Sequence, residues 1–546
     1  MSMTVVPRPI AELGPGRQRP FVGALARCLL WALLGGLTPG SANTQEVSGP
    51  LVTSGRLRFE VSTLYLYSDT RFGERMEGGT LIEEEEPLGF DFADTAVGAR
   101  LFPGLEALEQ SLATATGGPV EPLVLGSTRA VVTHDAVFLP LRMDIGIFDW
   151  LSVGGMVPFS RRRAEVARTF DGGGANAGLT PSVSDPGAVG VFLGGLSLAE
   201  AGLTTLADNL CSTNPTGASC SEASSLLTDG QLLRQSLLGA LASHGVFPMD
   251  GTATGAALQS RVAALMAAHE ALGVSYPNSI PLATQPLTEE DYGRLVTDAG
   301  YGVVGAPFGS WRSAWEMGDV ELYANVRLWA SALAEEPDEA RSGTNILVGA
   351  GGLVRLGTGL TDLADNFVDT GGGDGQQDLE LSLFSGLHRG RLGIWGEVRY
   401  GVAASTLVTR RITAPERIFA PLTSTQAVRW TPGNYYQIRL TPRFQLTEEM
   451  AVTVDVRAYS KKTDTYASLV ADDVPFPFDV GLLELETERN VLETGFGVVY
   501  STVRSGRGRP MEARFLFRRG VSGSGGATPK IDRFEFGLRL FKSIWN

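Results

Sequence analysis

The feature that most constrains the fold is a pair of alternating segments joined by a very short turn, between Phe138 and Phe159. In the first segment the apolar Leu139 and Leu141 alternate with the charged Arg142 and Asp144. Because successive side chains of a β-strand point to opposite faces, this alternation predicts an antiparallel hairpin with one apolar and one polar face. Such a hairpin suits a soluble sheet and a membrane barrel equally well, so the rest of the chain must distinguish the two.

The first 42 residues have the order of a secretory signal peptide. Arginines are followed by the apolar run CLLWALLGGL and then by PGSA, which ends at Ala42, where we expect cleavage. Arg27 precedes Cys28, whereas a lipoprotein signal needs a small residue there, so Cys28 is expected to be removed with the signal. Beyond this segment no stretch approaches the ~18 consecutive apolar residues of a transmembrane helix, and a helical membrane protein is not expected.

The composition favours an all-β architecture and argues against nucleic acid as a partner. The chain has 68 glycines among 546 residues and 19% charged residues, which suits a β-structure with many turns. Its formal net charge is −15, and removal of the four arginines and one glutamate of residues 1–42 makes it −18. A strongly acidic protein is repelled by the phosphates of nucleic acids.

After removal of the signal peptide, two cysteines remain, Cys211 and Cys220. They lie close together in a segment rich in Ser, Thr, Asn and Gly, and thiols oxidise once a protein has left the cytoplasm. We therefore predict a disulfide between them. A metal pair is the weaker alternative, because no further cysteine is available and the nearest histidine in the sequence is His244.

Twelve segments of the chain alternate in this way, and each is at least about as long as the ~9 to 11 residues that a tilted strand needs to cross a bilayer. The joints between the later segments alternate between short ones, such as HRGR and LTEE, and long ones. An even number of strands with short turns on one side and long loops on the other is typical of outer-membrane barrels. The predicted strands cover residues 57–67, 128–147, 151–159, 319–330, 344–357, 378–388, 391–403, 434–446, 450–460, 489–502, 511–519 and 531–542.

A long segment without alternation separates the third predicted strand from the fourth, and its later part has the marks of helices. Asp229 stands where it could cap GQLLRQSLLGALASH, ALQSRVAALMAAHEAL stops at Gly273, and Thr288 with Asp291 resembles a capping box. We predict a helical insertion that contains the disulfide. The expected domains are the signal peptide (1–42), three strands with a long acidic loop (43–160), the helical insertion (161–317) and nine strands (318–546).

The order of short and long joints also predicts an orientation. With the N-terminus in the periplasm, every short joint lies on the periplasmic side, and every long loop, the insertion included, lies outside the cell. The chain ends in RFEFGLRLFKSIW, an alternating segment close to the usual last strand of such barrels. We therefore expect a protein of the outer membrane of a Gram-negative bacterium, surrounded by lipid and lipopolysaccharide.

Three stretches carry a resemblance to a known family. They are PLRMDIGIFDWLSVGGMVPF, GDVELYANVRLW and the Gly- and Asp-rich loop in GTGLTDLADNFVDTGGGDGQQDLELSLF. They resemble the outer-membrane β-barrel family labelled as phenol meta-pathway degradation proteins or transporters, over residues 57–160 and 318–546. The resemblance implies a barrel and a transport role for small molecules. The helical insertion and the long first loop depart from the simpler pattern of that family.

If the apolar faces of the strands meet lipid, the barrel lumen receives charged side chains of both signs. Their plainest role is to pair with one another and stiffen the wall, and their functional role would be to tune a solute path. Aromatic residues on the same face, with Phe138 and Phe384 among them, could form an apolar pocket, provided that no strand slips by one residue. The candidates for the lumen wall are Arg142, Asp144, Glu321, Tyr323, Arg327, Trp329, Trp395, Glu397, Arg399, Arg439, Asp455 and Arg457.

Two charged clusters lie outside the predicted membrane region. Arg161, Arg162 and Arg163 could pair with lipopolysaccharide phosphates just outside the membrane, although arginines at a rim are more often simply solvated. Aspartates between Asp362 and Asp378 form an acidic loop, whose spacing matches no strict calcium loop, so a solvated loop is the plainer interpretation.

Enzymatic activity is not expected. The chain has four histidines, and the one suggestive pair, His134 beside Asp135, would place its two side chains on opposite faces of a strand. We expect no catalytic residue, no cofactor and no metal. The sequence predicts an outer-membrane channel or transporter for small, hydrophobic or aromatic, molecules. The alternative is a barrel without transport, structural or surface-binding, that contacts a partner through residues 161–317.

Overall fold

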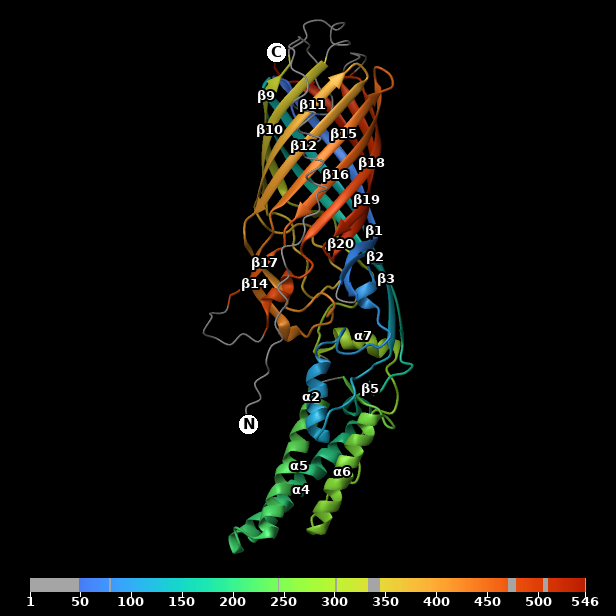
Figure 1. Ribbon diagram of the computed structural model, residues 1–546, viewed down its shortest axis with the longest axis vertical. Coiled ribbons are helices and arrows are strands. Elements are labelled where there is room, and N and C mark those ends of the chain that lie inside the picture. The colour runs from blue at the N-terminus through green and yellow to red at the C-terminus, as the bar shows by residue number, and fades with distance from the viewer. Residues whose placement is uncertain are drawn as a thin grey trace.

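The computed structural model describes residues 49–77, 80–243, 245–299, 302–331, 344–469, 478–503 and 509–545. The predicted signal peptide, residues 1–42, lies outside these described residues. A barrel forms one end of the elongated molecule, and a group of helices forms the other (Figure 1).

Twelve antiparallel strands close the barrel within the described part of the chain, as the alternation predicts. The sheet closes on itself because the first strand, β1, pairs with β3 on one side and with the last strand, β20, on the other. Closure pairs the backbone N–H and C=O groups between strands, which the interior of a bilayer requires. The barrel strands are β1 (Arg56–Glu77), β3 (Ser127–Phe148), β4 (Leu151–Asp171), β9 (Val320–Ala330), β10 (Thr344–Leu356), β11 (Asp378–Arg389), β12 (Leu392–Ala403), β15 (Tyr435–Gln445), β16 (Met450–Lys461), β18 (Arg489–Ser501), β19 (Met511–Ser524) and β20 (Thr528–Ser543).

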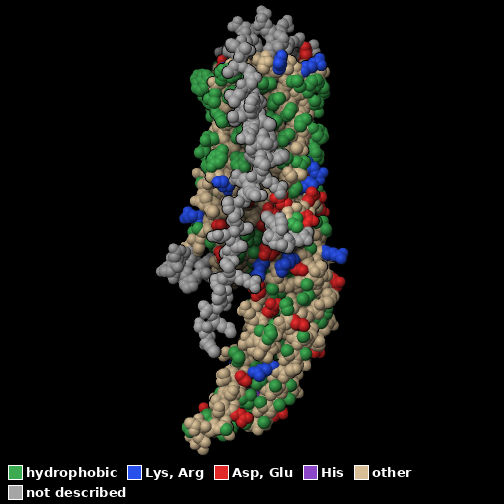
Figure 2. All heavy atoms as spheres, viewed as in Figure 1, with side chains coloured by type: hydrophobic (Ala, Val, Ile, Leu, Met, Phe, Trp, Pro, Cys, Tyr) green, Lys and Arg blue, Asp and Glu red, His purple; other side chains and the backbone are tan. Residues whose placement is uncertain are grey.

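The alternation gives the barrel an apolar outer surface and a charged inner one. On β11, for example, Leu379, Leu381 and Leu383 are exposed on the outside, whereas Asp378 and Glu380 are buried on the inside. Apolar side chains gather over the part of the barrel farthest from the helices (Figure 2). Such a band is the surface that a bilayer covers, so the architecture is that of an outer-membrane barrel.

Three strands, β1, β3 and β4, are much longer than this band needs, at 22, 22 and 21 residues. They continue toward the helices (Figure 1). The alternation predicts an end of the third strand at Phe159, but β4 runs on to Asp171, so the first residues assigned to the insertion are strand. The alternation changes at Arg161 because a strand that has left the membrane no longer needs an apolar outer face.

The acidic segment predicted as a loop is in part a strand, β2 (Thr80–Pro87), which pairs with β1. Strand formation is compatible with its run of glutamates because cations on neighbouring strands offset them. The Glu86 carboxylate lies 2.6 Å from the guanidinium of Arg71, and Glu85 lies 2.6 Å from the ammonium group of Lys530.

The predicted strands leave residues 520–530 between them, but the connection between β19 and β20 consists only of residues 525–527. Gly525 and Gly526 have φ angles of 112° and 78°. Glycine reaches such angles without steric cost, and this lets both strands extend up to a tight turn.

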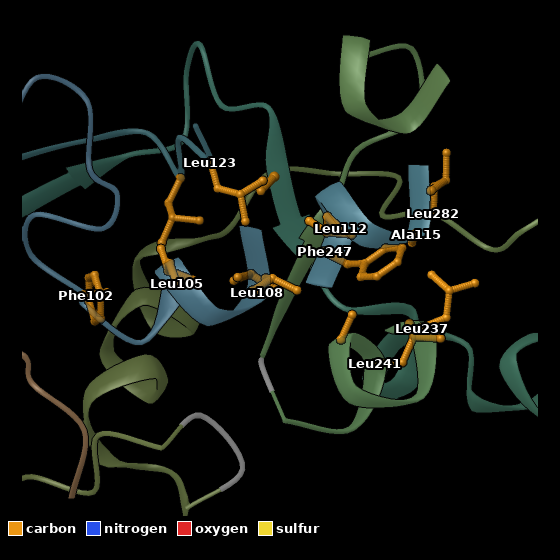
Figure 3. Close-up of a cluster of buried hydrophobic side chains, with 14 of the residues drawn as sticks. Phe102, Leu105, Leu108, Leu112, Ala115, Leu123, Leu237, Leu241, Phe247 and Leu282 are labelled. Atoms are coloured by element: carbon orange, nitrogen blue, oxygen red, sulfur yellow. The ribbon is translucent and has the colours of Figure 1, made fainter. Parts of the chain in front are cut away.

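The helices share one apolar core at the far end of the molecule. Leu112, Leu237 and Phe247 are fully buried in it (Figure 3). One of the helices, α2, comes from the connection between β1 and β3, so the helical region is assembled from two segments of the chain. The helices are α2 (Leu105–Thr116), α3 (Pro181–Ser184), α4 (Pro186–Thr213), α5 (Ala218–Ser243), α6 (Ala253–Ala271) and α7 (Glu289–Thr297).

Two of the three helix ends predicted from capping residues agree with the observed helix bounds. The Thr288 and Asp291 capping box begins α7, and Gly273, with a φ angle of 74°, follows the end of α6 as predicted. The prediction for Asp229 was wrong, because α5 begins at Ala218 and Asp229 lies inside it. The helix α4 was not predicted from the sequence, although it is long and apolar enough to cross a membrane by length and composition.

The predicted disulfide is confirmed. Cys211 and Cys220 are bonded, with their Cα atoms 4.9 Å apart, and they join the end of α4 to the start of α5.

Short elements lie at the end of the barrel that carries the long loops. β13 (Thr406–Arg411), β14 (Thr425–Thr431) and β17 (Thr465–Ser468) form a separate sheet, and β5 (Ala177–Leu179) pairs with β6 (Val246–Pro248). β7 (Trp311–Arg312) and β8 (Glu316–Met317) extend the barrel sheet beside β4. The described residues also form the 3₁₀ turns η1 (Phe90–Phe92), η4 (Leu422–Ser424) and η5 (Val480–Glu484).

Replacing Leu237 by alanine should destabilise the helical region by about 2–5 kcal/mol, because the cavity left in a closed core cannot be filled. Leu232 on the same helix is the matched control: it is 46% exposed, whereas Leu237 is 0% exposed, so its replacement should cost less than about 0.5 kcal/mol. Hydrogen exchange of the α4 and α5 amides measures both. Equal protection in the two variants would contradict the assigned core.

Candidate functional site

Alternate residues of the barrel strands face a lumen whose centre holds a cavity of about 250 Å³, here called the inner cavity. Its wall carries six arginines and five carboxylates, and the rings of Tyr323 and Trp395 also line it. The sequence supplies this wall through its period of two, since a charge at every second position of a strand falls on the same face.

The charges of the wall are tied into ion pairs that link neighbouring strands. The Glu60 carboxylate on β1 lies 2.7 Å from Arg514 on β19 and 2.8 Å from Arg539 on β20. On the other side of β1, the Arg58 Nε donates to Asp144 on β3 over 2.9 Å. Asp144 is fully buried. Its carboxylate is stable as an anion only because Arg58, Arg142 and the Tyr323 hydroxyl donate hydrogen bonds to it.

Residues 49–54 lie inside the lumen, at the end where the barrel turns are short. Arg58 donates hydrogen bonds to the carbonyl oxygens of Gly49 and Pro50, over 2.6 and 3.2 Å. The backbone N–H of Val52 donates to Ser152 Oγ over 2.7 Å. Because Gly49 and Pro50 line the inner cavity, this segment covers the cavity on its short-turn side.

A second, larger cavity of about 1010 Å³, here called the vestibule, lies on the side of the long loops. It is lined by residues of the barrel wall, such as Phe138 and Arg457, and by loop residues, such as Asp374. Burial raises the pKa of the Asp374 carboxyl. The vestibule and the inner cavity share two wall residues, Glu380 and Arg399, so the two spaces meet at this pair.

A chain of ion pairs lines the meeting point. Arg399 lies 2.9 Å from both Glu380 and Glu397, and the Tyr435 hydroxyl donates to Glu380 over 2.7 Å. Next to them, Arg355 contacts Glu321 and Asp378 over 3.0 and 2.5 Å. A solute that passes from the vestibule to the inner cavity must therefore pass charged groups that already have partners.

The structure brings most of the predicted wall residues together. Of the predicted set, the following line the inner cavity: Arg142, Glu321, Tyr323, Trp395, Glu397, Arg399, Arg439 and Asp455. Asp144 lies behind that wall, Arg457 lines the vestibule, and Arg327 lies opposite Gly349 on the inner face.

Trp329 departs from the prediction and lies on the outer surface, where it is 43% exposed. The pairing of β9 with β10 shifts by one residue between Val348 and Gly349, so Leu328 is an extra residue and Trp329 stands opposite Val348. A β-bulge of this kind moves the following side chain to the other face of the sheet.

Phe384 and Trp395, also expected in an apolar pocket, stack on each other with their ring centroids 5.4 Å apart.

The three predicted rim arginines have different surroundings. Arg162 points inward, is buried and pairs with Glu316 and Asp369, so it is not available to a lipid on the outside. Arg163 pairs with Asp135 over 2.6 Å, and Arg161 is exposed.

In the acidic loop between Asp362 and Asp378, the Asp369 carboxylate forms an ion pair with Arg162. Among the described residues no group of three or more His, Cys, Asp or Glu side chains could hold a metal ion.

The position of residues 49–54 inside the lumen was not predicted from the sequence. The contacts of this segment join residues about a hundred positions apart, such as Val52 and Ser152. The one local signal is Gly49–Pro50, just before the first strand, and such a pair marks a turn without showing where the chain goes next.

A scan of protein-family models finds no match to this chain, and a search of the curated proteins finds none either. Among solved structures, an outer membrane channel from Pseudomonas putida F1 is 7% identical over 93% of this chain and 100% of that chain, with a TM-score of 0.39. The Pseudomonas putida toluene transporter TodX is 9% identical over 93% and 96% of the two chains, with a TM-score of 0.26. The transport unit of the autotransporter AIDA-I from Escherichia coli is 7% identical over 96% and 99%, with a TM-score of 0.29. Scores this low carry no argument about function, which we derive from the geometry of the chain itself.

Replacing Asp144 by asparagine should destabilise the barrel by about 3–5 kcal/mol, because buried Arg58 then loses its counter-charge. The midpoint of unfolding in guanidinium chloride, followed by tryptophan fluorescence, measures the loss. Glu165→Gln is the control, since the exposed pair of Glu165 with Arg163 should contribute less than about 1 kcal/mol. A similar midpoint for both variants would show that the inner ion pairs do not support the barrel.

Proposed function

We propose that the protein is an outer-membrane channel that passes small solutes through the lumen of its barrel. The observation that carries the proposal is the succession of vestibule and inner cavity along the lumen, joined at Glu380 and Arg399. A polar lumen inside an apolar band is what a solute path across a bilayer requires.

The orientation follows from the lengths of the connections. Outer-membrane barrels keep short turns on the periplasmic side and long loops outside. The short-turn end, with residues 49–54, is then periplasmic, and the vestibule and the helices face the outside. A solute would enter the vestibule first and reach the periplasm once residues 49–54 move aside.

The charges of the lumen favour solutes with a polar group over purely apolar ones, since an apolar solute gains nothing among ion pairs. The rings of Tyr323 and Trp395 add an apolar surface in the inner cavity. Together with the resemblance to the phenol meta-pathway family, they favour a small aromatic solute.

A second candidate function is the binding of a partner at the cell surface through the helices. The exposed apolar side chains of α4, Val191 and Leu198, favour it. The double variant V191Q/L198Q separates the two functions: a channel keeps its flux, whereas a surface-binding protein loses attachment of the cells that carry it.

Liposome swelling with arabinose, a small uncharged sugar, tests the channel. Liposomes with the mature protein should swell faster than empty ones, and deletion of residues 49–54 should raise the rate several-fold, because the cover of the inner cavity is removed. If liposomes with the mature protein and liposomes with the variant without residues 49–54 both swell no faster than empty liposomes, the proposed function is wrong.

A further inference from the structure

Two arginines of the inner cavity, Arg142 and Arg439, contact their carboxylate partners through Nε alone. The cavity wall holds six arginines and five carboxylates, and each of these carboxylates already takes part in an ion pair. Arg58, Arg399, Arg514 and Arg539 in turn have strong partners. Arg142 and Arg439 differ from these four because each relies on one carboxylate that other donors also use.

Arg142 has a weak partner. Its Nε lies 3.3 Å from Asp144, whose carboxylate already accepts hydrogen bonds from Arg58 over 2.9 Å and from the Tyr323 hydroxyl over 2.8 Å. Its guanidinium lies over the Tyr323 ring, 4.3 Å from the ring centroid, and its side chain is 29% exposed. Among the described residues, its terminal nitrogens donate no hydrogen bond.

Arg439 has a close partner, but it shares that partner with other donors. It donates through Nε to Asp455 over 2.7 Å, and Asp455 is shared with Thr441 and Arg518. Its side chain is 31% exposed, and it stands directly opposite Arg457 on the neighbouring strand. On its other side Arg439 stands opposite Glu397, whose carboxylate is already paired with Arg399 over 2.9 Å.

An aromatic surface lies in the same cavity. Trp395 stacks on Phe384 and also lines the inner cavity, and its indole N–H donates no hydrogen bond within the described part of the chain. At about 250 Å³ the inner cavity is smaller than the ~300–1,000 Å³ of typical drug-binding pockets, which limits a ligand to about one ring.

We propose that the inner cavity is a binding site for a small aromatic carboxylate. Arg142 and Arg439 hold the carboxylate by charge-assisted hydrogen bonds from their terminal nitrogens, and Trp395 offers its ring to the aromatic part. The site gives the channel a preference for anions of this class over neutral aromatic molecules. This inference rests on the proposed function, since it places the site on the solute path.

Calorimetric titration of the folded mature protein in detergent tests the site, with benzoate, benzamide and acetate as probes. Benzoate should bind at least about tenfold more tightly than benzamide, which has the same shape without the charge, and than acetate, which lacks the ring. R142Q and R439Q should each weaken benzoate binding at least about tenfold. R429Q is the matched control, because Arg429 is exposed on β14, away from the barrel lumen.

Several results would overturn the proposal. They are equal affinities for benzoate and benzamide, equal affinities for benzoate and acetate, and unchanged benzoate binding in both R142Q and R439Q. The comparison of probes on the unmodified protein keeps the test valid even if a variant does not fold. Swelling of arabinose liposomes without benzoate binding would refute this site alone, whereas benzoate binding without any swelling would refute the channel.

Discussion

Ion pairs between neighbouring strands on the inner wall of the barrel are the interactions on which the rest of the structure depends. They are concentrated where the sheet closes: Glu60 on β1 joins Arg514 and Arg539 of the last two strands, and Arg58 joins Asp144 of β3. The outer face of the barrel gains little from packing, because lipid tails are as apolar as leucine. Inward charges that match across each pair of strands therefore help to select both the register and the closure.

The same ion pairs shape the lumen. They line its centre with charged groups, hold residues 49–54 over part of it through Arg58, and line the step from vestibule to inner cavity at Arg399. Stability and selectivity then come from one set of residues. The exceptions are Arg142 and Arg439, whose partners are already shared, and a ligand can use them without breaking the wall.

The sequence predicts the barrel well and the contents of its lumen less well. Alternation of period two is a local property, so it reveals all twelve strands of the described barrel and most of the inward residues. It fails where a long-range contact decides, as at the bulge beside Leu328, which turns Trp329 outward, and in residues 49–54. The capping residues of α7 are readable, whereas α4, rich in glycine, is stabilised by packing that no local pattern shows.

The most direct test of a solute path through the lumen is the single-channel conductance of the refolded mature protein in a planar bilayer. A barrel whose inner cavity is covered by one short segment should show small, discrete openings, since that segment is held by a few hydrogen bonds. Stable insertion with no conductance at any applied voltage would show a sealed lumen and contradict the proposed channel.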